Sequence, residues 1–191
     1  MSGDFLGRQF QLGAETPAIW GLSARRLKRA GDLLFDLYVA DLEAMAREVS
    51  PLDLENLEVV GPATLLLGLA TENILKAIAI EKNPQSMKDG KLRDWPPGHD
   101  LVRLAELAGI ELNEKQRDLL QRIGAFVEWA GRYPIPKKAT KLAIRQLNIN
   151  RPFLPLPLQP YERQDFEALF GNLYSMVIIE ERAVDSSEEA G

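Results

Sequence analysis

The chain has 191 residues, of which 46% are hydrophobic and 27% are charged. This length and mix are typical of one globular domain with a full core, and they exclude a collagen-like or disulfide-stapled chain. The formal net charge is −5, with 23 Lys and Arg against 28 Asp and Glu, so any contact with nucleic acid must be local. The absence of cysteine excludes disulfides, thiol catalysis and cysteine-bound metals.

Residues 1–12 contain no continuous apolar stretch, so they predict neither a signal peptide nor a membrane anchor, and we expect residues 1–22 to form an extended arm. A cytoplasmic location is therefore the default prediction. The first predicted helix covers residues 23–49, with Ser23 as its N-cap and an apolar side facing the core. Its first two turns carry four bases, which we interpret as a solvated face with later Asp partners: Arg25, Arg26, Lys28 and Arg29.

The most apolar segment, residues 62–80, is nearly long enough to cross a bilayer. Glu72, Asn73 and Lys76 lie in its middle, where hydrocarbon would penalise them, so we predict the central helix of a bundle and no membrane partner. Glu72 and Lys76 are four residues apart in the favourable order for an ion pair. On so apolar a helix the pair should be partly buried and have a further partner, which favours a structural role over a functional one.

The middle of the chain predicts a long loop over residues 83–98, a short helix over 100–108 and a longer helix that ends near Gly131. Asn113 with Gln116 three residues later predicts a capping box for the longer helix. His99 stands just before Asp100 at the start of the short helix, so a capping role is favoured over catalysis. We group four residues as a predicted structural polar cluster: Glu72, Lys76, His99 and Asp100.

The segment 132–151 contains six bases and no acid, so it carries +6 while the rest of the chain carries −11. Clustered bases attract phosphate even on an acidic protein, which makes this segment a candidate contact for nucleic acid or a partner. The alternative is that the bases neutralise an acidic patch of the same fold or of a dimer mate. The candidate binding residues are Arg132, Lys137, Lys138, Lys141 and Arg145.

Four prolines between residues 152 and 160 predict an extended strap, and the apolar residues between them suggest that the strap packs against the body. Together with the basic segment it forms a predicted basic and Pro-rich strap over residues 132–160. A last helix is predicted over 161–182, followed by a flexible acidic tail over 183–191. No strong strand signal appears, so residues 23–182 predict one all-α, up-and-down bundle of about five helices.

The sequence lacks the common enzyme motifs. The single histidine, His99, excludes any metal site that needs two imidazoles, and there is no Gly-rich phosphate loop, GxSxG elbow or HExxH motif. No set of carboxylates is spaced for a metal ion. We therefore predict no metal and no cofactor.

Three segments nevertheless resemble the HEPN domain family, in order and approximate spacing. They are Ala70-Thr71-Glu72-Asn73-Ile74-Leu75-Lys76-Ala77, Gly98-His99-Asp100-Leu101 and Gly131-Arg132-Tyr133-Pro134. The resemblance covers roughly residues 23–134. It implies a helical bundle that forms homodimers, in a family of RNA-cleaving toxins and of helper domains beside nucleotidyltransferases in bacterial conflict systems.

Active members of that family carry an arginine followed after four to six residues by a histidine, and the dimer joins two such pairs into a metal-independent ribonuclease site. Arg132 matches the arginine, but Lys137, Lys138 and Ala139 stand where the histidine should fall. Lysine is a poor proton shuttle at neutral pH. The favoured hypothesis is a non-catalytic HEPN-like module that dimerises and binds protein or RNA in a bacterial defence or toxin–antitoxin system. The alternative is a divergent ribonuclease that uses Arg132.

Overall fold

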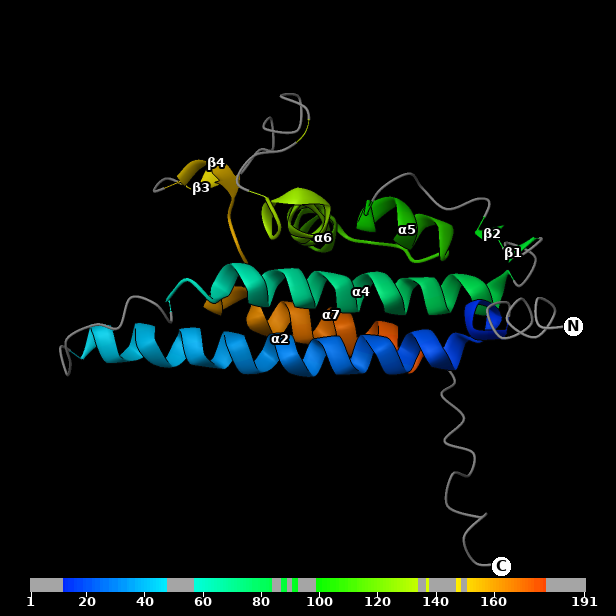
Figure 1. The fold of residues 1–191 in the computed structure, drawn as a ribbon, viewed down its shortest axis with the longest axis horizontal. Helices are drawn as coiled ribbons and strands as arrows, with labels where there is room; N and C mark the ends of the chain where they lie inside the picture. Colours follow the sequence, from blue (N-terminus) through cyan, green and yellow to red (C-terminus); the bar gives the residue numbers. More distant parts are fainter. Residues whose placement is uncertain are drawn as a thin grey trace, which may run out of the picture.

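The computed structural model describes residues 12–47, 57–83, 87–88, 91–92, 99–133, 137, 147–148 and 151–177. These residues form an all-α helical bundle, as the periodicity predicts (Figure 1). Its main helices are α2 (Pro17–Ala46), α4 (Val60–Lys82), α5 (Leu101–Leu107), α6 (Glu114–Ala125) and α7 (Arg163–Ser175). Two short single-turn elements complete the helical part: the π-helical turn η2 (Phe126–Ala130) and the 3-10 turn η4 (Pro160–Glu162).

Helix α4 lies at the centre of the bundle. In Figure 1 it runs antiparallel to α2, with α7 packed beside both of them and with α5 and α6 on the opposite face of α4. Its side chains are buried on most of its circumference because neighbours cover it on several sides. By length and composition α4 could cross a membrane, but 72% of its most apolar window is buried inside the bundle, as in core helices generally.

In Figure 1 helix α7 runs in the same direction as α4 and opposite to α2, whereas α6 is seen nearly end-on and crosses α4. Gly68 permits this crossing. A Cβ atom at Gly68 would overlap the side chains of Val127 and Ile123, so only glycine lets the two backbones come this close. The prediction of a uniform up-and-down bundle is therefore corrected for α6.

The first helix begins at Pro17, and not at Ser23. Proline suits a first helical position because its missing N–H has no intrahelical partner there, and Thr16 before it is extended. Residues 12–15 are also helical, so the described part of the predicted extended arm is helical instead. Ser23 lies inside α2, where its hydroxyl accepts a hydrogen bond from Asn73 Nδ2 at 3.2 Å.

The capping box predicted for the longer helix is confirmed, whereas the predicted capping role of His99 is wrong, because Asp100 caps α5 and His99 Nδ1 bonds to Glu72. Asn113 and Gln116 form the capping box of α6, and Asp100 Oδ1 accepts a hydrogen bond from the backbone N–H of Arg103 at 3.0 Å. The last five residues of the predicted longer helix form the π-helical turn η2, which sequence periodicity does not distinguish from an α-helix.

Two short antiparallel strand pairs accompany the helices. β1 (Met87–Lys88) pairs with β2 (Lys91–Leu92), and β3 (Leu147–Asn148) pairs with β4 (Arg151–Pro155). Asp89-Gly90, which separates the first two strands in the sequence, is a dipeptide that favours hairpin turns. Helix α7 ends at Ser175, before the predicted end at residue 182, and the next two residues are not helical; the predicted tail 183–191 lies outside the described residues.

Candidate functional site

A buried carboxylate organises the first polar cluster. Glu72 of α4 is only 6% exposed, and its two oxygens have different partners. Oε1 lies 2.5 Å from Lys76 Nζ, and Oε2 lies 2.6 Å from His99 Nδ1, just before α5. The Lys76 ammonium also lies 5.1 Å from the ring centroid of Trp20 in α2. The cluster therefore connects three elements of the bundle.

This connection has the character of a structural device. Both Glu72 oxygens are engaged, which compensates the cost of burying the charge. Asp100, which the sequence places in the same cluster, caps α5 instead. The structure thus brings together Glu72, Lys76 and His99, adds Trp20, and assigns Asp100 to a neighbouring helix end.

The Pro-rich strap is held by an arginine that sequence reasoning missed. The Arg122 side chain is 4% exposed, and its Nη1 donates hydrogen bonds to the carbonyl oxygens of Leu156 at 3.2 Å and Pro157 at 3.0 Å. Its Nη2 forms an ion pair with Glu162. Leu158 of the strap is fully buried, so this part of the strap packs against the body as predicted. The available signal was a base between the core positions Leu119 and Ile123.

Arg132, the weak catalytic candidate, is engaged at a helix end. Its Nη2 donates hydrogen bonds to the carbonyl oxygens of Val127 at 2.5 Å and Glu128 at 2.8 Å. The backbone N–H groups of residues 131–133 donate to the carbonyl oxygens of Phe126 and Trp129. The carbonyl oxygens of Val127 and Glu128 accept hydrogen bonds from the Arg132 guanidinium instead. Lys137 is exposed, whereas Lys138, Lys141 and Arg145 lie outside the described residues.

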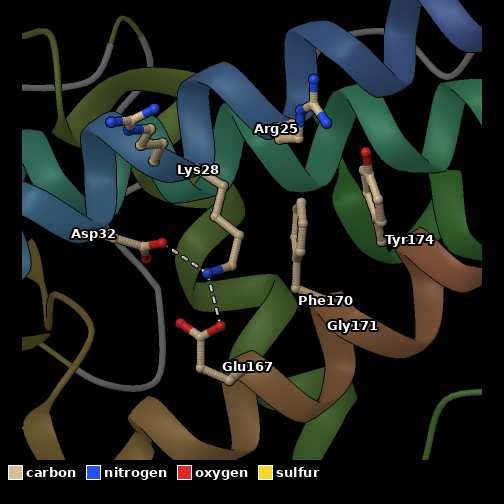
Figure 2. Close-up of a pocket in the computed structure, with 8 residues that line it drawn as sticks. Arg25, Lys28, Asp32, Glu167, Phe170, Gly171 and Tyr174 are labelled. Atoms are coloured by element: carbon tan, nitrogen blue, oxygen red, sulfur yellow. Dashed lines mark hydrogen bonds and ion pairs between the residues drawn. The ribbon is translucent and has the colours of Figure 1, made fainter. Parts of the chain in front are cut away.

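A separate groove of about 290 Å³ lies between α2 and α7 (Figure 2). Figure 2 shows Arg25, Lys28 and Asp32 reaching it from α2, opposite Glu167, Phe170 and Tyr174 from α7. Three of the four bases that the sequence assigns to a solvated face, Arg25, Lys28 and Arg29, therefore lie on one wall of this groove. Sequence periodicity alone carries no signal that α7 supplies the other wall.

The three bases of the groove differ in their partners. Lys28 Nζ lies 2.8 Å from Asp32 and 2.6 Å from Glu167, so its charge is compensated. This pairing with Asp32 matches the predicted Asp partner. Arg25 and Arg29 are exposed and have no carboxylate partner among the residues that the structure describes.

Two aromatic side chains line the groove, Phe170, which is buried, and Tyr174, which is half-buried. The rings of Phe170 and Tyr174 stack with centroids 6.1 Å apart and planes at 19°, and the Lys28 ammonium lies 5.5 Å from the Phe170 centroid. Gly171 lies between them in sequence, and a Cβ atom there would meet nothing within 4 Å. The groove thus combines the partly exposed ring of Tyr174 with the two guanidinium groups of Arg25 and Arg29, a combination that suits a ligand with flat rings and negative charge.

In the described part of the chain, no group of three His, Cys, Asp or Glu side chains could hold a metal ion. Comparison with known protein families, with curated proteins and with solved structures found no match. The functional argument therefore depends on the site itself.

Proposed function

We propose that this chain is a non-catalytic, HEPN-like helical module that dimerises and binds single-stranded RNA through the α2–α7 groove. The observation that carries the proposal is the pair of guanidinium groups of Arg25 and Arg29, which have no carboxylate partner among the described residues and line the same groove as the half-buried ring of Tyr174. Single-stranded nucleic acid is bound by this pairing of cations for the phosphates and aromatic faces for the bases.

The engagement of the other polar groups supports binding over cleavage. The Nδ1 atom of His99 is taken by Glu72, and the Arg132 guanidinium bonds to two backbone carbonyls. A ribonuclease site needs a group that moves protons beside a group that stabilises the phosphate. In the described part of the chain, Arg132 and His99 make no hydrogen bond to each other, so no observation supports the ribonuclease alternative.

The proposal also relocates the predicted RNA contact. The sequence places it in the segment 132–151, where only Arg132 and Lys137 among the candidate binding residues are described. The cationic residues of the groove lie on α2, a long helix that packs in the bundle, so their backbone positions are fixed. Arg25 and Arg29 are four residues apart on α2 and lie on the same side of it.

The test is retention and cleavage of a mixed single-stranded RNA pool by the pure full chain. Double replacement of Arg25 and Arg29 by Gln should weaken retention and lower the salt slope by about 1.4, since each phosphate contact contributes roughly 0.7 for single strands. Double replacement of Arg103 and Arg117 by Gln makes the same charge change on α5 and α6 and should leave retention unchanged.

Three results would contradict the proposal. Retention that is absent in the wild type would remove RNA as the ligand. An equal loss in the α5–α6 control would show a response to net charge and not to the groove. Cleavage that disappears with Arg132→Ala would establish the ribonuclease alternative instead.

A further inference from the structure

The outer face of α2 carries an exposed seam made of Arg26, Ala30, Leu33, Leu37 and Ala40, of which all but Arg26 are apolar. Residues 26, 30, 33, 37 and 40 follow one another at spacings of four, three, four and three, and all five are exposed. Leu33 is 61% exposed and Leu37 is 50% exposed, with Ala30 before them and Ala40 after them. This alternation of three and four is the spacing at which one helix packs along another. We call these five residues the α2 seam.

The seam faces away from the rest of the bundle. Phe35, halfway along it in sequence, is 1% exposed and points to the core, so Leu33 and Leu37 on either side point outward. Helix α7 contacts α2 through Lys28 and Asp32, on a different side. In Figure 1 the edge of α2 opposite α4 is bare of other described elements.

Charge along α2 indicates which partner fits the seam. The first half exposes three bases that have no carboxylate partner among the described residues: Arg25, Arg26 and Arg29. The second half exposes Asp36, which is 70% accessible and lies 4.0 Å from Arg163, and Glu43, which is 60% accessible and pairs with Arg47 at 3.1 Å. A second α2 in the opposite direction would set bases beside acids, whereas a parallel one would set bases beside bases.

We infer that a second copy of this chain packs along the α2 seam in antiparallel orientation. A twofold axis midway between Leu33 and Leu37 pairs each of these leucines with the other leucine of the second copy. The same axis pairs Ala30 with Ala40, whose small side chains let the helices approach closely. A self-complementary patch of this kind is what a twofold interface requires.

The same geometry places opposite charges on one flank of the seam. Arg29 lies on the side of α2 that also carries Asp36 and Glu43, as the helical period requires. In a twofold antiparallel pair, equivalent flanks face each other. Arg29 of each copy therefore lies beside the stretch of the second copy that carries Asp36 and Glu43, and the two α2–α7 grooves open on the same side of the dimer.

This inference rests on the dimer part of the proposed function and names its surface. Light scattering of the full chain at several concentrations should give twice the chain mass of 21.4 kDa. Double replacement of Leu33 and Leu37 by Glu should halve the observed mass while helical circular dichroism stays unchanged. Leu107→Glu, at a 48% exposed leucine of α5, is the matched control and should stay dimeric.

Orientation is tested with cysteines, because the chain has none of its own. Oxidation of a mixture of Ala30→Cys and Ala40→Cys chains should give a disulfide between the two variants. A tag that changes the mass of one variant identifies this mixed dimer. Ala30→Cys alone should not crosslink. Charge reversal adds a second check: Arg29→Glu should weaken the dimer, and combination with Glu43→Arg should restore it.

Each failure has a distinct meaning. A dimer that survives both Glu replacements would overturn the α2 interface and leave dimerisation standing. A wild-type monomer at every concentration would overturn both the interface and the dimer part of the proposed function. Crosslinking of Ala30→Cys with itself would overturn the antiparallel orientation. RNA retention, measured on the same samples, reports on the groove separately.

Discussion

The hydroxyl of Thr64 in α4 accepts a hydrogen bond from the backbone N–H of Leu158 at 3.0 Å, across 94 residues of sequence. The same hydroxyl donates to the carbonyl of Val60 at 2.8 Å. Both Thr64 and Leu158 are fully buried, so this hydroxyl satisfies a backbone group that water cannot reach. The Pro-rich strap is thereby attached to the central helix.

Thr64→Val should lower the free energy of unfolding by about 1–3 kcal/mol, because it leaves the buried Leu158 N–H without a partner. Thr71→Val is the matched control. The Thr71 hydroxyl is also buried but only donates to the Leu67 carbonyl within the same helix, so its loss should cost less. Urea denaturation measures both. Equal losses would show that the Leu158 contact adds nothing.

Arg122→Met should destabilise the protein by about 3–5 kcal/mol, because Glu162 then loses its buried counter-charge and two strap carbonyls lose a donor. Arg117→Met removes an ion pair with Glu106 in which both side chains are about half exposed, and it should cost less than about 1 kcal/mol. Chemical denaturation compares the two variants. A small effect at Arg122 would show that the strap is held by apolar packing alone.

Glu72→Ala should cost about 3–5 kcal/mol, since it leaves the Lys76 ammonium without its closest carboxylate and removes the acceptor for His99. Glu81→Ala makes the same replacement at an exposed position of the same helix and should be nearly neutral. Thermal unfolding, followed by circular dichroism, measures the stability of both variants. If Glu72→Ala retains stability but loses a measured activity, the cluster would be functional and not structural.

Burial raises the pKa of the Tyr38 phenol above its ordinary value of 10.0. The neutral phenol is therefore favoured in the folded state, so its contribution to stability is complete below pH about 10 and is lost as pH rises through the raised value. Tyr38→Phe should show a shallower alkaline fall in the free energy of unfolding than the wild type. Tyr161→Phe, at a 79% exposed tyrosine, should follow the wild type. Parallel curves for all three would contradict this role.

Gly171→Leu should weaken RNA retention while stabilising the fold. A side chain at Gly171 points into open space beside the groove, and replacing a mid-helix glycine gains about 0.5–1 kcal/mol. Gly171→Ala gains similar stability with a much smaller side chain and should retain most RNA binding. Filter binding and denaturation are measured on the same preparations. Undiminished retention by the leucine variant would exclude the groove as the RNA site.

Local patterns in the sequence accounted for the elements but not for their contacts. The capping box at Asn113, the ion-pair spacing of Glu72 and Lys76 and the apolar period of α4 depend on residues within a few positions of one another. The start of α2 was misplaced by six residues because a good N-cap at Ser23 competed with Pro17, and only packing of the first turns decides between them.

By itself the sequence determined that this protein is an all-α chain with a buried central helix, because helical period and apolar content are local properties. Tertiary structure alone decided which polar residues meet. Thr64 and Leu158, Glu72 and His99, and Lys28 and Glu167 are joined across long stretches of chain. Such pairs depend on how whole helices pack, and no spacing along the chain encodes that packing.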